Sequence, residues 1–473
     1  MSSEKGISQC ENPETEEIKP QENDIQTQLA FINHLSSQAQ KAGSSAHQTR
    51  HRSTQSSPKI LDSLANSCVS RPGEVIATAM RPGNSEVPAE IIIATDGVIP
   101  EKTIGHLRAF WAMLRNISLY ARQGHETKVK HLHLTGLITS AKIKVLEFTF
   151  REIQRKVISE LDTFRGLQTG HLLPRHPIWD ARRHLWSINC EFMRAANGYE
   201  IQDPPRRLER WSRLYILLEE AALAIRGIFK CNKTGEGHVD LSPNVEYYLK
   251  KIVHVTKDLK NLTIIAIKPR YKSLFDLEPV ITALPHQQRK MQDLPCSSGE
   301  WLKALKGPLT WCNQQPGTAN PPVFDGYMEK YCEQMTRYRS VGAAVVHCEV
   351  KLLMYLCEPR RALNEDERIG TIAYIGVSRV PCLGCFVFHR ALNEVLDMRF
   401  EMNRGYSGPD FPWAFPERCP RRDEVLQSVY SKLTTFWVPW YSGCSKHQAL
   451  TRSRAMREDL SSTARRKLAR LGP

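Results

Sequence analysis

Two short motifs in the C-terminal third constrain this chain more than any other feature. The first is His347-Cys348-Glu349, and the second is Pro381-Cys382-Leu383-Gly384-Cys385. The apolar run from Val350 to Cys357 predicts a buried helix, and the β-branched run Thr371 to Val377 predicts a buried strand. Apolar residues after the second motif predict another helix. The order helix, strand, helix is typical of layered α/β folds.

The residue types in the motifs suit a metal ion. Cys382 and Cys385 are three residues apart at the start of a predicted helix, so both lie on one face. Pro381 suits the first helical position, and the helix dipole there favours the thiolate form that binds zinc. His347 would be a third ligand, leaving the fourth tetrahedral position to water. If the helix begins close to His347, Glu349 also lies at this point and would take a proton from that water.

Two alternatives stay open at this stage. In one, zinc only stabilises the fold, and Cys348, Cys357 or His389 closes the site as fourth ligand. His389 follows Cys385 by four residues and so shares its helix face. In the other, no metal binds at all. In a closed site Glu349 would be a surface carboxylate or a core carboxylate with its partners satisfied.

Several blocks resemble the cytidine deaminase-like superfamily, and more narrowly the nucleotide or nucleic-acid deaminase-like branch expanded in fungi. They are residues 347–353, 374–379 and 382–385, followed by 404–408 with Trp413 and Pro416. The resemblance implies Zn²⁺ ligation by His347, Cys382 and Cys385, with Glu349 as the proton shuttle. It implies hydrolytic deamination of a cytosine- or adenine-like base. It also implies a three-layer α/β/α fold around a mixed sheet and substrate contacts from Ser378, Arg404, Ser407 and Trp413.

Two features depart from the family pattern. Ser407 and Pro409 stand where many relatives have histidine and lysine, which keeps open a catalytically inactive, zinc-stabilised binding module. The superfamily domain also begins with a helix and a β-hairpin. The run Asn261 to Ile267 would supply one hairpin strand if the domain started near residue 240.

The rest of the chain divides by composition. Residues 1–88 are rich in Ser, Gln, Glu, Asn and Thr and predict a disordered arm. Apolar residues at helical spacing predict a helical domain over 89–290, and prolines between 283 and 322 predict a boundary. We expect a zinc deaminase-like domain over 300–444. Residues 445–473 form a basic tail, which is a solvated tail or a nucleic-acid-binding or nuclear-import segment.

Net charge and cysteine content limit the partners and the cellular compartment that we expect. The net charge of +15 favours polyanionic partners, so a nucleobase substrate could be a nucleoside, a nucleotide or single-stranded nucleic acid. Thirteen scattered cysteines do not form a disulfide scaffold. With neither a signal peptide nor a membrane span expected, we predict an intracellular protein of the cytoplasm or nucleus. Protein partners are not predicted.

Overall fold

A computed structural model describes residues 20–41, 60–83, 86–123, 128–170, 172–196, 204–289, 294–314, 326–336, 344–358, 374–403, 412–438 and 441. The chain folds into two compact units, each assembled from separate segments. One unit comprises 1–46, 291–342 and 421–473, and the other comprises 47–290 and 343–420. Among the described residues, none of the helices has the length and apolar character that a membrane crossing requires.

The larger unit is built on a small mixed sheet with strand order β3-β2-β1-β6. Strands β1 (Ile76–Arg81) and β2 (Glu90–Thr95) form an antiparallel hairpin, and both are buried along nearly their whole length. Strand β3 (Val280–Ala283) runs parallel to β2, and β6 (Gly376–Val377) runs antiparallel to β1. The motif-bearing C-terminal third therefore completes a sheet whose central strands come from the N-terminal fifth of the chain.

Helix α2 (Ile60–Ser67) fastens β6 to the sheet. The Asp62 carboxylate accepts hydrogen bonds from the backbone N–H of Val377 at 2.9 Å and from the Tyr374 hydroxyl at 2.7 Å. Thr78 of β1 donates its hydroxyl to the Leu61 carbonyl at 2.9 Å. The Asp62 side chain and the Leu61 carbonyl of α2 thus satisfy buried groups of the sheet, which helps to order this helix.

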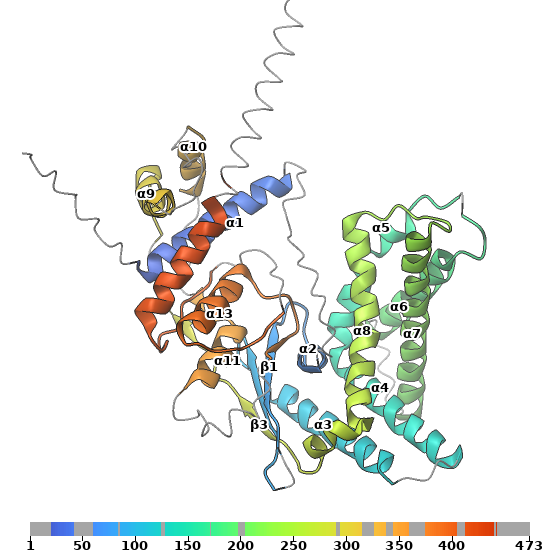
Figure 1. Ribbon diagram of the computed structural model, residues 1–473. Coiled ribbons are helices and arrows are strands. Elements are labelled where there is room, and N and C mark those ends of the chain that lie inside the picture. The colour runs from blue at the N-terminus through green and yellow to red at the C-terminus, as the bar shows by residue number, and fades with distance from the viewer. Residues whose placement is uncertain are drawn as a thin grey trace, which may run out of the picture. The chain divides into compact units, whose positions relative to one another are not determined.

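A helical insertion, defined as helices α3 to α8, separates β2 from β3 in sequence (Figure 1). Its helices are α3 (Glu101–Ala121), α4 (Lys128–Ile158), α5 (Leu161–Arg165), α6 (Pro177–Ala196), α7 (Pro204–Thr234) and α8 (Pro243–Ile267). Prolines open α6, α7 and α8, where the missing N–H costs nothing. Ser242 caps α8 by accepting from Val245 N–H at 3.4 Å. The 3-10 helix η1 (Pro269–Phe275) then leads to β3.

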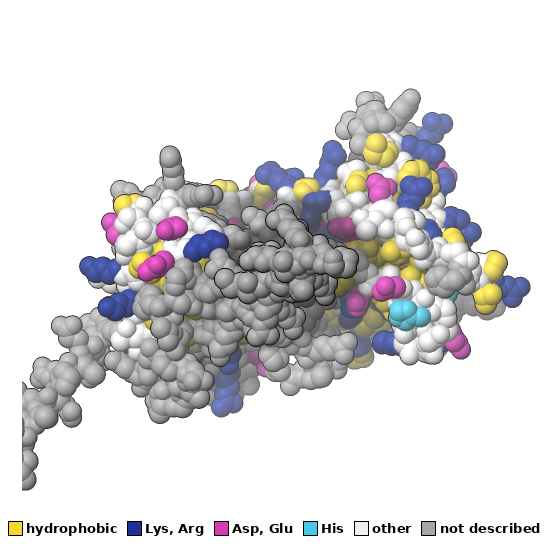
Figure 2. Space-filling view, turned by 90° about the horizontal axis from the view of Figure 1, so that it is seen from above, with side chains coloured by type: hydrophobic (Ala, Val, Ile, Leu, Met, Phe, Trp, Pro, Cys, Tyr) yellow, Lys and Arg dark blue, Asp and Glu magenta, His cyan; other side chains and the backbone are white. Residues whose placement is uncertain are grey.

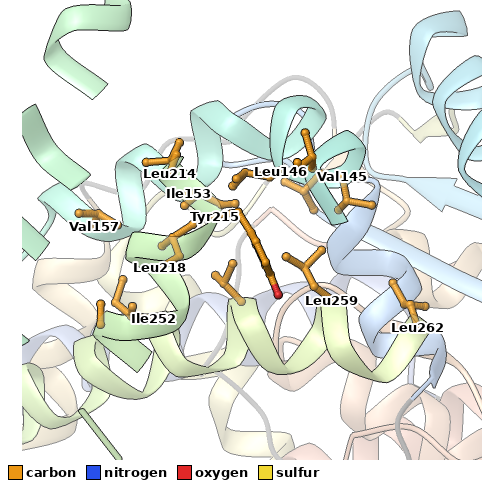
Figure 3. Close-up of a cluster of buried hydrophobic side chains, with 14 of the residues drawn as sticks. Val145, Leu146, Ile153, Val157, Leu214, Tyr215, Leu218, Ile252, Leu259 and Leu262 are labelled. Carbon is orange, nitrogen blue, oxygen red and sulfur yellow. The ribbon is translucent and has the colours of Figure 1, made fainter. Parts of the chain in front are cut away.

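The core of the insertion lies between α4, α7 and α8 (Figure 3). Aliphatic side chains spaced three or four residues apart on each helix meet there, as the periodicity predicts. Tyr215 is the polar member: its hydroxyl donates to Glu219 at 2.7 Å and accepts from Lys142 at 2.7 Å. Figure 2 shows basic and apolar side chains interspersed over the described surface of the helical insertion.

The remaining elements of the larger unit contain the two motifs or lie next to them in the chain. A two-stranded sheet pairs β4 (Gln288–Arg289) with β5 (Ala344–Val345). Helix α11 (Cys348–Cys357) contacts β1 and β2, and α13 (Leu383–Val395) contacts α11.

The smaller unit is helical in its described part. It contains α1 (Glu22–Lys41), α9 (Ser298–Gln314), α10 (Gly326–Met335) and a helix over 422–438. Phe31 of α1 packs edge-on against Trp437, with ring centroids 5.2 Å apart. Buried Gln28 accepts from both Thr434 and Trp437. Segments from the two ends of the sequence therefore share one core.

This arrangement differs from the domain ranges predicted from composition. The predicted disordered arm, 1–88, contains α1, α2 and β1, because their few apolar residues are buried against segments far along the chain. The predicted helical domain and the motif segment share one sheet rather than forming separate domains. Residues 261–267 belong to α8, so they do not form a hairpin strand. The predicted tail, 445–473, lies outside the described residues.

The fold class agrees with the prediction at a coarser level. The protein is mostly helical with a small mixed sheet, and its α/β character fits a deaminase-like domain.

Candidate active site

The first motif lies where a helix begins. His347 is the N-cap of α11, with an extended backbone at φ −65° and ψ 155°. Glu349 lies in the first helical turn and is buried. In a helix interior, residues two apart point in different directions, but the extended cap residue allows both side chains to reach one point.

The second motif begins helix α13 in the same way. Cys382 is the N-cap, and its sulfur accepts the backbone N–H of Cys385 at 3.4 Å. Two helix N-termini therefore meet at the site, and their dipoles favour anionic groups such as thiolates.

The structure brings His347, Cys382 and Cys385 together. One ligand atom from each lies within 4.8 Å of the others, and all three residues are buried. His347 Nδ1 is 3.4 Å from the Cys382 sulfur. Tetrahedral zinc, with bonds of about 2.0 Å to nitrogen and 2.3 Å to sulfur, requires a separation of about 3.5 Å between these atoms. The donor set and its spacing therefore fit Zn²⁺.

The residues proposed to close this site have other partners. The ring Nε2 of His389 is 2.7 Å from the Phe400 carbonyl oxygen, which it contacts in place of the cluster. The Cys348 thiol donates to Glu349 Oε2 at 3.4 Å. Among the described residues, neither they nor Cys357 belong to the three-residue cluster. This geometry argues against a site closed by a fourth protein ligand.

Glu349 lies directly beside the cluster. Its Oε2 accepts from the Cys385 thiol at 3.6 Å. Burial, reinforced by the negative charge of Asp96, raises the pKa of Glu349 to about 7. A carboxyl group with a pKa near neutrality exchanges a proton readily at physiological pH.

Two residues of the cluster, Cys382 and His347, interact as opposite charges. Burial opposes the thiolate of Cys382, but hydrogen bonds from Cys385 and His347 outweigh it and lower the Cys382 pKa to about 5. Burial likewise opposes the imidazolium of His347, yet the contact with Cys382 raises the His347 pKa to about 10. Cys382 is thus held in the metal-binding form.

Asp96 belongs to the site, although no motif in the sequence predicts it there. It directly follows β2, and its carboxylate accepts the backbone N–H of Cys348 at 2.8 Å. Ligand atoms of Asp96, His347 and Glu349 also lie within 4.8 Å of one another. The sequence signal was a lone Asp-Gly after an apolar run, which reads as a turn.

Two further buried residues support the site. Lys351 Nζ donates to the Thr95 carbonyl at 2.6 Å and so ties α11 to the end of β2. Trp413 is fully buried and packs against Gly384 and Phe388. Burial raises the pKa of the Cys385 thiol well above its ordinary range, and the nearby Trp413 side chain partly offsets this rise.

The residues predicted to contact substrate are placed as follows. The Ser378 hydroxyl accepts the backbone N–H of Ile76 at 2.9 Å and so caps β1. Trp413 lies in the core beside α13. Arg404 and Ser407 lie outside the described residues, as does Pro409.

Hydrolytic enzymes that activate a metal-bound water typically hold zinc with three protein ligands, so that one coordination position stays open. A carboxylate beside the ligands is also typical of this class. The comparison with known families narrows this class. Residues 346–417 match the family of OTT_1508-like deaminases, which assigns this segment to the deaminase-like superfamily. The match includes both motifs and Trp413. No curated protein and no solved structure matches the chain.

Proposed function

We propose that the protein is a zinc-dependent hydrolytic deaminase that acts on a cytosine- or adenine-like base. The observation that carries the proposal is the convergence of His347, Cys382 and Cys385 with Glu349 beside them. The deaminase family match over 346–417 supports the reaction class independently of the geometry.

The chain's residues have distinct roles in this proposal. His347, Cys382 and Cys385 would hold Zn²⁺, which supplies a water of lowered pKa as nucleophile. Glu349 would take one proton from the nucleophilic water and deliver it to the ring nitrogen. It would then take a second proton, from the hydroxyl that this water leaves on the reacting carbon, and deliver it to the amino group, which leaves as ammonia. Asp96 and Lys351 position the two segments that meet at His347.

The proposal includes a three-layer α/β/α arrangement of the core. Burial of β1 and β2 along both alternating sets of side chains supports it. So does the contact of β1 with both α2 and α11. An intracellular setting is also part of the proposal, because the ligand thiols must stay reduced to bind metal.

The test compares wild-type protein with Glu349→Gln, using ammonia release from cytidine, adenosine and single-stranded oligonucleotides. We expect the substitution to lower turnover at least about 100-fold, because it removes the proton carrier while keeping the side-chain size. Zinc content, measured on the same samples, should not change. Glu329→Gln in α10 is the matched control and should retain full turnover.

A second candidate is a zinc-stabilised binding module without activity, favoured by the contact of two thiols with the Glu349 carboxylate. It gains if wild-type protein carries zinc and releases no ammonia from any of these substrates. Both candidates predict zinc loss in Cys382→Ser. Only a closed structural site predicts the same loss in Cys348→Ser or His389→Ala.

A further inference from the structure

Four basic side chains from three separate segments gather in the larger unit, and we call them the basic patch. Arg155 and Lys156 end α4, Lys251 lies on α8, and Arg379 follows β6. Arg379 lies close enough for its positive charge to act on both Lys156 and Lys251. Burial is the main cause of the lowered pKa of each lysine. Repulsion from the neighbouring cations lowers the pKa of Lys251 further, whereas for Lys156 the attraction of Glu152 and Asp258 is stronger than the repulsion from either arginine.

Acidic residues balance only part of this charge. Glu152 accepts from Arg155 at 2.6 Å and lies 3.7 Å from Lys156 Nζ. Asp258 also acts on Lys156, but its carboxylate is occupied by Ser63 and Asn66 of α2. In the described part of the chain, the charge of Glu152 acts on both Lys251 and Arg379, but neither forms a direct ion pair with it. Unpaired cations held close together repel one another, and an anionic ligand would relieve that repulsion.

An aromatic ring accompanies the patch. Tyr247 is 44% exposed, and Lys251 Nζ lies 4.2 Å from the centre of its ring. Aromatic rings interleaved with cations are typical of sites for single-stranded nucleic acid. Here Lys251 lies over one face of the Tyr247 ring, so the ring holds a cation at the surface where a phosphate can reach it.

The patch adjoins the candidate active site along the chain. Arg379 precedes Cys382 by three residues, which span at most about 11 Å. Segment 378–381 runs from β6 to the N-cap of α13, so a strand bound on Arg379 lies next to the metal ligands.

We propose that Arg155, Lys156, Lys251 and Arg379 bind the phosphate backbone of single-stranded nucleic acid and deliver one of its bases to the site at Glu349. The inference rests on the proposed function and narrows its substrate from nucleobase compounds in general to a polymer. The helical insertion thereby gains a task, since it supplies three of the four cations.

The test measures binding of a fluorescent single-stranded oligonucleotide by anisotropy over a range of salt concentrations. It uses the full chain carrying Glu349→Gln, so that binding is recorded without turnover, and it runs DNA and RNA in parallel. The patch variant adds Lys251→Gln and Arg379→Gln. Arg155 and Lys156 are left intact because they also complement the α4 dipole.

The matched control adds Lys268→Gln and Arg270→Gln, which remove the same charge from exposed positions after α8. These positions lie about 25 Å along the helix axis from Lys251. We expect the patch variant to bind about tenfold or more weakly at 0.1 M salt. Its plot of log affinity against log salt should be shallower by about 1.4, the value for two lost phosphate contacts on a single strand. The control should bind like its parent.

If the patch variant and the control lost oligonucleotide affinity equally, the proposed phosphate site would be wrong, since the loss would then follow net charge alone. Absence of oligonucleotide binding by a protein that deaminates free nucleosides would also overturn it, while the proposed function would stand. Conversely, patch-dependent binding by a wild-type protein without turnover would refute the deaminase and retain the phosphate site. In active protein, the patch variant should lower the ratio of kcat/KM for oligonucleotide to kcat/KM for nucleoside.

Discussion

The carboxylate of Asp96 meets the first amide of α11, although 252 residues separate it from Cys348. This contact caps a helix that has a candidate metal ligand, His347, at its own N-terminus. The placement of His347, Glu349, Cys382 and Cys385 at two helix starts could be predicted from sequence, because each pair lies within a few residues and obeys helix-start geometry. Asp96 could not, because no local pattern links the end of one strand to a helix so far along the chain.

Asp96→Ala should lower the free energy of unfolding by about 1 to 2 kcal/mol, since it leaves the amide of Cys348 without its acceptor. Asp96→Asn keeps an oxygen at this position and should lose less than half as much. Urea unfolding monitored by tryptophan fluorescence provides the measurement. An equal loss in both variants would show that the charge, and not the hydrogen bond, matters.

Helix α2 is the element whose role was least visible in the sequence. It lies in a Ser- and Asn-rich stretch that composition assigns to a disordered arm, yet it packs on β1, β6 and α8. The long amphipathic helices α3, α4 and α6 to α8 were predictable because their apolar periodicity is strong. The predicted hairpin strand at residues 261–267 was wrong, because a run of Ile and Thr fits a buried helix face as well as a strand.

Gly376→Ala tests the packing of β6 on α2. A Cβ at this glycine would overlap the carbonyl group of Leu61, a backbone atom that cannot move aside. We expect a loss of roughly 3 kcal/mol in thermal or urea unfolding. Gly105→Ala in α3 is the control, because its Cβ would enter open space and should slightly stabilise the helix.

The contact of α2 with α8 should make stability depend on pH. Asp258 of α8 accepts from Ser63 and Asn66, and burial raises its pKa from 3.8 to about 6. Below pH 3.8 both folded and unfolded chains are protonated and the contribution to stability is complete. As pH rises toward 6 the unfolded chain ionises first, so the contribution is progressively lost.

Asp258→Asn cannot ionise and should lack this loss. Between pH 4.5 and pH 7, the unfolding free energy of wild type should fall relative to the variant by on the order of 2 kcal/mol. Urea unfolding at the two pH values measures the difference. A constant difference between the proteins would mean that Asp258 has the same pKa in both states.

At the scale of the whole molecule, sequence ranges and compact units do not coincide. Both units combine segments from distant parts of the chain, so composition along the sequence predicts elements but not their grouping. The predicted deaminase-like range, 300–444, lacks α2, β1 and β2 and includes helices of the smaller unit.

A fragment of residues 300–444 should therefore fail to fold, whereas a fragment of 47–420 contains both segments of the larger unit and should retain zinc. Circular dichroism and bound-zinc analysis of the two purified fragments measure this. A folded, zinc-loaded fragment of 300–444 would show that the N-terminal strands are dispensable.

The pairing of Ala77 with Val377 also has a consequence for biosynthesis. Strand β1 leaves the ribosome about 300 residues before its partner β6, which corresponds to roughly 15 to 60 s at translation rates of about 5 to 20 residues per second. Throughout this interval β1 is an edge strand of the newly made hairpin, and its backbone N–H and C=O groups on that edge have no partner strand. The candidate ligands His347, Cys382 and Cys385 are among the last parts of the sheet-bearing unit to be made. The nascent chain therefore cannot complete their cluster until the sheet can close.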